Sequence, residues 1–466
     1  MESKIQQQLF KDLMDKRHYT LAQEYAMDYL DKGRERNVFP AATALENLSH
    51  FDEELPKLAA TETEDILKQL HSFGSPATVH TNISGRYFGF VSGGVVPASL
   101  SVKLLSDFWD QAPALDVLSP IGGKLESVVE GWLKELFGLP EQTVAGFVSG
   151  TSLAIFCGLA AGRYRILERL GWDVNAKGLN GAPNIRVITS KHTHSTVKKA
   201  IATLGLGLDN VEWVDVDDQG RILVDQVPQL DDRCLLILQA GNVNSGSFDD
   251  LATLCERAKK ANAWVHVDGA FGLWAACVEE LKYLTQGLEL ASSFSVDGHK
   301  TLNTPYDSGV VLCTDSDALV KALQATGGYI LYDDNKRDGM RYTPEMSRRA
   351  RVIEMWAAIK YLGKQGIDEM VLGMHHRAVQ FAKEFKEHGF EVLNDVVFNQ
   401  VLVRYKDDES TTKLAHQVQE LRECWVGGST WFGKKVIRVS VCSWATTSDD
   451  VTRSVNSFVK ARDMIG

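Results

Sequence analysis

Short apolar runs that alternate with helix-length segments constrain this chain more than any other feature of its sequence. The runs are Val144–Val148, Ile185–Ile188, Val211–Val216, Cys234–Leu238, Trp264–Val267 and Gly309–Cys313. Strands of a parallel sheet are covered on both faces, so they read as nearly continuous apolar runs. The pattern therefore predicts an α/β fold with a mostly parallel central sheet, in which ligands bind beyond the carboxyl ends of the strands.

The regions of sequence on either side of this central part show a different pattern of apolar and charged residues. Residues 1–75 carry apolar residues at helical spacing among many charges, which predicts a helical N-terminal arm that packs on a partner subunit or caps its own chain. A long helix is expected at Arg348–Leu362, and beyond it short apolar runs alternate with helical stretches. The expected organisation is thus a helical arm, a large α/β domain at 76–347 and a small α+β domain at 348–466.

The composition narrows the classes of protein to which the chain can belong. Lys and Arg number 50 and Asp and Glu number 61, and the resulting net charge of -11 argues against nucleic acid as a partner. The polar N-terminus lacks a signal-peptide core, and no apolar stretch reaches the length of a membrane span. The seven cysteines are scattered without Cys-x-x-Cys spacing, so neither a metal site nor a disulfide framework is expected. These features predict a protein of the reducing cytoplasm.

Asp268 and Lys300 each follow an apolar run. If the two runs are neighbouring strands, their carboxyl ends bring a carboxylate and an amine together. Pyridoxal phosphate (PLP) requires such a pair, because the lysine forms a Schiff base with the cofactor and the Asp keeps the pyridine nitrogen protonated. The alternatives are an Asp that caps a strand end and a solvent-exposed lysine.

A hydroxyl-rich turn, Ser149–Ser152, lies between an apolar run and a helix-like segment. The N–H groups of a helix start, together with the hydroxyls of Thr151 and Ser152, suit a phosphate group. The turn lacks the spacing of a Walker loop. The alternative is an ordinary Ser/Thr N-cap.

Three further side chains follow or interrupt strand-like runs. His194 can stack on an aromatic cofactor and pass a proton; with His192 it forms a His-x-His, but no acidic or Cys ligand stands beside the pair, so metal is not expected. Asn244 lies in a strand-end loop, where its amide can orient a cofactor. Arg438 is a lone charge in an apolar run, which is typical of a guanidinium that holds a carboxylate. The alternatives are a capped loop histidine, a turn residue and a solvent-facing arginine.

The order of these segments resembles that of the group II PLP-dependent amino-acid decarboxylases, which include the aromatic-amino-acid and glutamate decarboxylases. The resemblance extends from about His80 to Trp444 and includes Ser149-Gly-Thr-Ser, Ser190-Lys-His-Thr-His, Asp268-Gly-Ala and Gly298-His-Lys. The cofactor-binding residues expected from it are Thr151, Ser152, His194, Asn244, Asp268, Ala270, His299 and Lys300. The expected catalytic residues are Lys300, His194 and Asp268, and the expected substrate-binding residues are Arg438, Tyr87 and Phe88.

The resemblance also implies an architecture and a reaction. It implies PLP fold type I, the aminotransferase-like fold, and a homodimer whose active sites lie at the subunit interface. The implied reaction removes CO₂ from an L-amino acid, with Arg438 on the substrate carboxylate and a loop tyrosine or His194 delivering the proton afterwards. An aromatic or other bulky uncharged substrate is favoured.

The chain departs from the family at one catalytic position. Counting back from Ser347-Arg348-Arg349, relatives carry a tyrosine that protonates the substrate carbon, and this chain has Gly339 at that count. Tyr332 or Tyr342 would serve if the loop follows another path. The departure leaves open a PLP-dependent carbon–carbon lyase, an aldehyde synthase or an aminotransferase. A further hypothesis is a non-catalytic protein that binds PLP or another anion.

Overall fold

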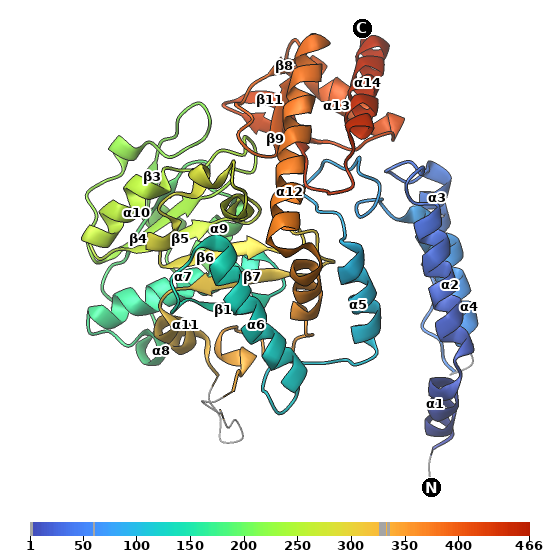
Figure 1. The fold of residues 1–466 in the computed structure, drawn as a ribbon, viewed down its shortest axis with the longest axis horizontal. Coiled ribbons are helices and arrows are strands. Elements are labelled where there is room, and N and C mark those ends of the chain that lie inside the picture. The colour runs from blue at the N-terminus through green and yellow to red at the C-terminus, as the bar shows by residue number, and fades with distance from the viewer. Residues whose placement is uncertain (1–2, 59–60, 326–331, 333–335) are drawn as a thin grey trace.

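The N-terminal region consists of helices that lie to one side of the molecule (Figure 1). The computed structural model describes residues 3–58, 61–325, 332 and 336–466. The first helices are α1 (Lys4–Met14), α2 (Arg17–Asp31), α3 (Ala42–Glu46) and α4 (Thr63–Gln69), and α2 packs against α4. Leu9 and Leu13 of α1 are 62% and 60% exposed, so the apolar face of this helix lacks a packing partner within the described chain.

A seven-stranded sheet forms the centre of the molecule. Its strands, in spatial order, are β1 (Val144–Val148), β7 (Gly309–Cys313), β6 (Ser293–Asp297), β5 (Trp264–Asp268), β4 (Cys234–Gln239), β2 (Arg186–Ser190) and β3 (Val211–Val214). β7 runs antiparallel to both neighbours, whereas the remaining neighbouring pairs are parallel. Each predicted apolar run corresponds to a strand, and β6 is the strand that precedes the His-Lys segment.

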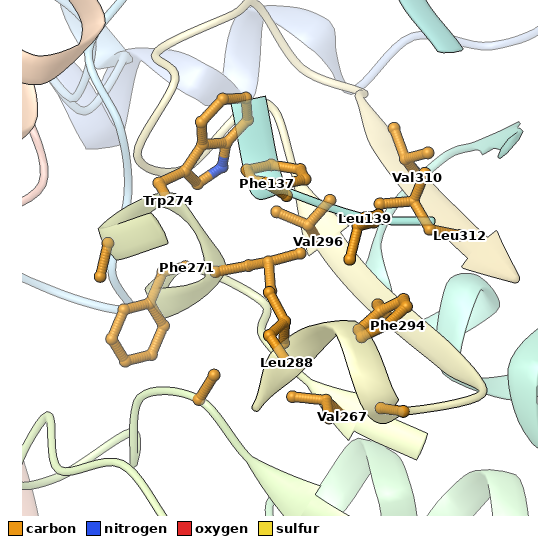
Figure 2. Packing of buried hydrophobic residues seen from close by; sticks show 14 of the residues in the cluster. Phe137, Leu139, Val267, Phe271, Trp274, Leu288, Phe294, Val296, Val310 and Leu312 are labelled. Atoms are coloured by element: carbon orange, nitrogen blue, oxygen red, sulfur yellow. The ribbon is translucent and has the colours of Figure 1, made fainter. Parts of the chain in front are cut away.

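Alternate residues of the central strands enter two different hydrophobic cores, which explains why the strand sequences are continuously apolar. In β4, Leu236 and Leu238 belong to one cluster, while Leu235 and Ile237 belong to the other. Figure 2 shows part of the first cluster around Phe294 of β6. Burial of a side chain of this size contributes about 1.5–3 kcal/mol. The two cores together hold the sheet, and therefore its strand ends, in a fixed arrangement.

Helices cover both faces of this sheet. They are α5 (Pro97–Asp107), α6 (Pro120–Phe137), α7 (Thr151–Arg169), α8 (Val174–Lys177), α9 (Ser195–Thr203), α10 (Leu251–Lys260) and α11 (Ser316–Leu323). Short helical turns are η1 (Asn47–Phe51), η2 (Leu70–Gly74), η3 (Ser75–Ala77), η4 (Leu208–Asn210), η5 (Val224–Gln226), η6 (Gly272–Cys277), η7 (Lys282–Thr285), η8 (Leu288–Leu290) and η9 (Gly339–Arg341). Both ends of α6 are set by capping residues. Ser119 Oγ accepts a hydrogen bond from the N–H of Gly122 at 3.2 Å, and Gly138 ends the helix with a φ of 64°.

A second, four-stranded antiparallel sheet lies in the C-terminal part of the chain. Its strands, in spatial order, are β10 (Gly427–Trp431), β11 (Lys434–Ser440), β9 (Gln400–Arg404) and β8 (Glu391–Val392), and the helices beside it are α13 (Asp408–Leu421) and α14 (Ser448–Ile465). The strand-like runs near 391, 401 and 436 correspond to β8, β9 and β11. β10 was not predicted, because its Gly-Gly-Ser start has no apolar pattern.

A long helix, α12 (Val352–Glu387), packs against α5 and α6 at one end and α14 at the other (Figure 1). The helix predicted at Arg348–Leu362 began too early, because Arg349 and Arg351 lie before the helix and form ion pairs with Asp307. It also ended too early: the chain bends at Gly363 and continues as helix. Like the other helices in the described part of the chain, α12 does not combine the length and apolar character needed to cross a membrane.

Candidate active site

A cavity of about 710 Å³ lies at the carboxyl ends of the central strands, where ligands of such sheets bind. Seven of the predicted site residues line it: Thr151, His194, Asn244, Asp268, Ala270, Lys300 and Arg438. The first six follow or end β1, β2, β4, β5 and β6, whereas the last lies on β11 of the small sheet. Segments far apart in sequence therefore meet at one site.

Asp268 is the buried carboxylate of this cavity. It ends β5 and lies beside Ser295 of the neighbouring strand β6. Its Oδ1 accepts hydrogen bonds from Ala270 N and Ser295 Oγ, both at 3.3 Å, and these are the hydrogen bonds that the described residues make to it. Burial raises the pKa of Asp268, while the charges of His194 and Lys300 act in the opposite direction. Its Oδ2 is left available for a cationic N–H donor.

Lys300 follows β6 and faces the same cavity. Its Nζ lies 2.9 Å from Oδ2 of Asp297, a carboxylate that is itself almost fully buried. Burial lowers the pKa of Lys300, but the charge and hydrogen bond of Asp297, together with the charge of Asp268, raise it, and the net shift is upward. The lysine is therefore held as an ammonium in a fixed position.

Thr151 stands at the start of α7, where the sequence predicts a phosphate site. Its backbone N–H donates to Asp297 Oδ1 at 2.7 Å, and its hydroxyl donates to Asp297 Oδ2 at 2.9 Å. Ser152 is exposed and is not among the residues that line the cavity. Asp297 was missed as a site residue, although it stands only three residues before Lys300.

His194 is fixed in place because it caps α9. Its Nδ1 accepts from the backbone N–H of Thr196 at 3.3 Å and lies 2.7 Å from Thr196 Oγ1. Burial lowers the pKa of His194 below its ordinary value, and the nearby Asp268 only partly offsets this. At neutral pH the imidazole is therefore uncharged, as suits a ring that stacks on a cofactor.

Arg438 and Asn244 connect the small sheet to the cavity. Arg438 Nη1 donates to the backbone oxygen of Val243 at 3.1 Å, and Ser429 Oγ lies 2.8 Å from Asn244 Oδ1. The Arg438 guanidinium is half-buried and forms no ion pair with any described residue, and burial lowers its pKa. A cation without a counter-ion at this depth favours an anionic ligand.

The remaining predicted residues lie outside the cavity wall. His299 Nδ1 accepts a hydrogen bond from the backbone N–H of Ser308. Its Nε2 lies 3.6 Å from Asp297 Oδ2. Tyr87 stacks on Trp425, with ring centroids 5.0 Å apart.

The structure places Phe88 away from the cavity. It is buried in the core of the small sheet against Phe381. Phe90, two residues later, lines the cavity instead and was missed. Phe90 and Val91 have φ values of 52° and 57°, so the chain turns here and the alternation of a strand does not hold.

Gly339 occupies a position where no larger residue fits. A Cβ there would lie 2.2 Å from Arg348 Nη2 and 2.4 Å from the backbone oxygen of Pro113. The Arg348 guanidinium is fully buried and paired with Glu126 of α6 at 2.7 Å, so it cannot easily move. The glycine is thus required by packing on α6, and the absence of a tyrosine at this count has a structural cause.

Neither alternative tyrosine lines the cavity within this chain. Tyr332 donates through its hydroxyl to the backbone oxygen of Ala325 at 2.7 Å. The Tyr342 ring lies under the guanidinium carbon of Arg337, 4.7 Å from the ring centroid. Part of the segment between these tyrosines, residues 333–335, lies outside the described residues.

Comparison with known proteins identifies the family. The model of the pyridoxal-dependent decarboxylase conserved domain matches residues 46–406. The chain belongs to the pyridoxal-dependent decarboxylase family. This result confirms the family and PLP as the predicted cofactor, and it supports the predicted decarboxylase reaction class.

Individual relatives of this decarboxylase agree with the family model. The chain is 27% identical over 339 residues to an aromatic-L-amino-acid decarboxylase of Bacillus atrophaeus, which covers 69% of this chain and 68% of that protein. It is 25% identical over 467 residues to a histidine decarboxylase of Drosophila melanogaster, covering 92% of this chain but only 53% of the relative, so it spans about half the length of the latter. The crystal structure of Oryza sativa TDC with PLP and tryptamine superposes with a TM-score of 0.87 at 20% identity, covering 97% of this chain and 98% of that one, which confirms PLP fold type I.

The residues of this decarboxylase fit PLP. The cofactor carries an aldehyde, a ring nitrogen and a phosphate, and the cavity presents a lysine amine, the free Oδ2 of buried Asp268 and the N-terminus of α7. The described residues contain no group of three or more His, Cys, Asp or Glu that could hold a metal ion. The lysine amine, the carboxylate and the helix N-terminus together suit an organic, anionic cofactor.

Proposed function

We propose that this family member converts an L-amino acid into its amine and CO₂. The observation that carries the proposal is the meeting of three groups in one cavity. These are the amine of Lys300, the buried carboxylate of Asp268 and the guanidinium of Arg438, which has no ion-pair partner among the described residues. The first two suit PLP and the third suits the substrate carboxylate.

Each of these side chains has a distinct task. Bound PLP supplies a ring that accepts the electrons of the breaking bond between Cα and the carboxylate. Lys300 would hold the cofactor through Nζ, and Asp268 would stabilise the protonated ring nitrogen. Arg438 holds the departing carboxylate by charge-assisted hydrogen bonds, which fixes the orientation of the bond that breaks.

His194 is the residue that we propose as the proton carrier. It lies in the cavity wall, and its Nδ1 is occupied by the cap of α9, so the neutral ring carries its proton on Nε2. Tyr332 and Tyr342 do not reach the cavity of their own chain. After CO₂ leaves, the imidazole passes its proton to Cα and recovers another from solvent.

The substrate side chain is proposed to be uncharged. Apart from the groups already assigned to PLP and to the α-carboxylate, the described lining includes Phe90, His192, Ser429 and Thr430 but no further carboxylate, lysine or arginine. Burial lowers the pKa of His192, so this imidazole is neutral at pH 7. Such a lining favours an aromatic or other bulky neutral side chain over an acidic or basic one.

A homodimer is also proposed, with the N-terminal arm in the interface. Leu104 of α5 and Phe108 just after this helix are 49% and 65% exposed, and Val117 and Leu118 are 81% and 55% exposed, in addition to the apolar face of α1. Exposed apolar residues in such number mark an interaction surface. Sedimentation analysis should give twice the mass of 51.6 kDa, and a monomer at micromolar concentration would contradict the dimer.

The proposal also includes a division of the chain into three domains and a location in the cytoplasm. The helical arm at 1–75, the large domain at 76–347 and the small domain at 348–466 follow the two sheets and the exposed helices. All seven cysteines are buried free thiols, which fits a reducing cytoplasm.

The decisive test is a product screen. The purified protein, loaded with PLP, is incubated with a mixture of common amino acids, and the products are identified by mass spectrometry. An amine that equals one parent minus CO₂ is expected and would also name the substrate. Complete absence of product from any amino acid, with PLP bound, would contradict the proposal and favour a non-catalytic PLP-binding protein.

A second reaction on the same cofactor is favoured by one observation. Position 339 cannot hold the tyrosine that protonates the substrate carbon in relatives, because Arg348 and Pro113 fill the space. An altered proton delivery would turn the reaction towards an aldehyde synthase, a carbon–carbon lyase or an aminotransferase. The same screen distinguishes them, since an aldehyde, a shortened amino acid and a keto acid differ in mass from the amine.

A further inference from the structure

Asp297 is a buried carboxylate to which neither the family match nor the sequence analysis assigned a role. The residue is 1% exposed and ends β6, three residues before Lys300. One of its oxygens accepts from the backbone N–H of Thr151 at 2.7 Å, and the other accepts from the Thr151 hydroxyl and lies 2.9 Å from Lys300 Nζ. A single side chain thus bridges the cofactor lysine and the first residue of α7.

The fold brings these groups together through two glycines. β7 lies between β1 and β6, and its first residue, Gly309, packs directly on Gly150 of the turn before α7. A Cβ at 309 would lie 2.4 Å from the Cα of Gly150, and a side chain would push the turn away from β6. With glycine at both positions, the start of α7 lies over the end of β6, within reach of Asp297.

Several charged or titratable groups face Lys300 from the surrounding elements. They are Asp297 at the end of β6, His299 after it, Asp268 of β5, His194 before α9, Tyr306 before β7, and Arg438 and Cys442 of the small-sheet side. Of the described residues, Asp297 alone forms an ion pair with Nζ. His194 is neutral at pH 7, and Asp268 is the proposed partner of the cofactor's ring nitrogen. Asp297 is therefore the group whose removal changes the surroundings of the amine most.

We propose that Asp297 is a positioning residue for the cofactor lysine: its carboxylate bridges Lys300 Nζ to the first turn of α7 and controls when the amine is free to bond the cofactor's aldehyde. The inference rests on the proposed function only in taking Lys300 as the lysine that binds PLP. In that step the ammonium first releases a proton to solvent. The free amine then bonds the aldehyde carbon, and the aldehyde oxygen leaves as one water.

The same geometry changes the expected phosphate site. The N–H and hydroxyl of Thr151, which the sequence assigns to phosphate, already bind Asp297. The phosphate must compete for these donors with a buried negative charge. Replacing the carboxylate by an amide is therefore expected to free the amine and to remove a repulsion from the phosphate, both of which favour capture of PLP.

The first experiment measures Lys300 without cofactor or turnover. The full-length apo-protein is acetylated with acetic anhydride at pH 7 to 11, and labelling of Lys300 and of exposed lysines is quantified in the same digest by mass spectrometry. In the wild type, Lys300 is expected to be labelled with a midpoint above that of the exposed lysines. A midpoint equal to or below theirs would overturn the proposal, and this measurement needs no variant to fold.

The matched variant is Asp297→Asn, which keeps an acceptor for Thr151 N–H and removes the charge. Its Lys300 midpoint is expected to fall by about one pH unit, which gives about tenfold more labelling below both midpoints. The control is Asp250→Asn, because Asp250 caps α10 through the same pair of contacts, to the N–H and hydroxyl of Thr253, and has no lysine partner among the described residues. A merely structural role predicts equal Lys300 profiles for wild type and D297N, and that result would overturn the proposal.

The second readout is the capture of PLP itself. The rate at which apo-protein develops the shifted absorbance of lysine-bound PLP is measured against pH for wild type, D297N and D250N. D297N should react about tenfold faster than the other two at pH 7, with the curves converging at high pH. An unchanged rate profile in D297N would contradict the proposal. If the acetylation profiles shift as expected while the product screen finds no reaction, the positioning role stands and the proposed function fails.

Discussion

The two sides of the cavity balance their charges in different ways. On the side of the large sheet, Lys300 is paired with Asp297, which is anchored in turn by Thr151 of α7. On the side of the small sheet, Arg438 donates to one backbone carbonyl and forms no ion pair with any described residue. A paired cation is fixed before any ligand arrives, whereas an unpaired one gains most when an anion binds. The difference supports the proposal that the first side binds the cofactor and the second binds the substrate carboxylate.

Removal of the lysine should abolish the function of the large-sheet side. Lys300→Ala is expected to lose both the shifted absorbance of lysine-bound PLP and measurable turnover, because no other amine lines the described cavity. Absorbance spectra and the product assay check this. Lys434→Ala, a change at an exposed lysine of β11, should behave as wild type. Retained turnover in K300A would remove the basis for assigning this side to the cofactor.

Removal of the unpaired cation should affect substrate more than cofactor. Arg438→Met is expected to raise KM about 10–100-fold, since a hydrogen bond to a charged group contributes roughly 1.5–3 kcal/mol. The affinity for PLP should change little. Steady-state kinetics and PLP titration separate the two effects, and Arg221→Met provides a control at an exposed, ion-paired arginine. A loss of PLP affinity with unchanged KM would reverse the assignment of the two sides.

The large-sheet side also buries groups in their neutral form, and this should appear as a pH dependence of stability. His266 of β5 is fully buried, its Nδ1 lies 2.9 Å from Ser293 Oγ, and burial lowers its pKa to about 3. Below pH 6.5 the unfolded chain gains a proton here that the folded protein does not. The free energy of unfolding therefore falls by about 1.4 kcal/mol per pH unit down to about pH 3.

Urea unfolding of the apo-protein between pH 7 and 4 measures this contribution. His266→Asn should show a shallower loss of stability with falling pH than the wild type, although it is less stable at pH 7. His416→Asn, a change at an exposed histidine, should leave the slope unaltered. Parallel curves for H266N and wild type would show that His266 does not stay neutral in the folded state.

The smallest expected effect concerns the contact between the two sides. Ser429→Ala removes the 2.8 Å hydrogen bond to Asn244 and should cost about 1 kcal/mol of stability. Asn244→Ala should cost a similar amount, and the double variant should cost less than the sum, because both changes remove one interaction. Strict additivity in urea unfolding would mean that this bond does not couple the two sheets.

The sequence predicted the central sheet and most of the cavity because both depend on local patterns. Continuous apolar runs arise from burial on both faces, and residues at the ends of such runs converge wherever the strands are neighbours. For this reason Lys300, which follows β6, lies close to Asp268 at the end of the adjacent strand β5.

What the sequence did not predict depends on contacts between distant segments. Asp297 reaches Thr151 only because Gly309 of the intervening strand lets the turn approach, and no local pattern contains that information. Phe88 and Phe90 were not distinguished, because the turn between them is set by backbone conformation rather than by alternation. β10 has almost no apolar residues, so its pairing with β11 provides the only signal for it.

The part of α12 beyond its bend joins one hydrophobic core of the large sheet to the core of the small sheet. Gly363 has a φ of 60° that residues with a side chain rarely adopt. Ile359 before it and Ile367 and Val371 after it all pack in the core of the large sheet, whereas Met374 and Phe381 further along pack in the core of the small sheet. One continuous stretch of helix beyond Gly363 therefore fixes the separation between Arg438 and Lys300, and a break within it would alter the width of the cavity without touching its wall.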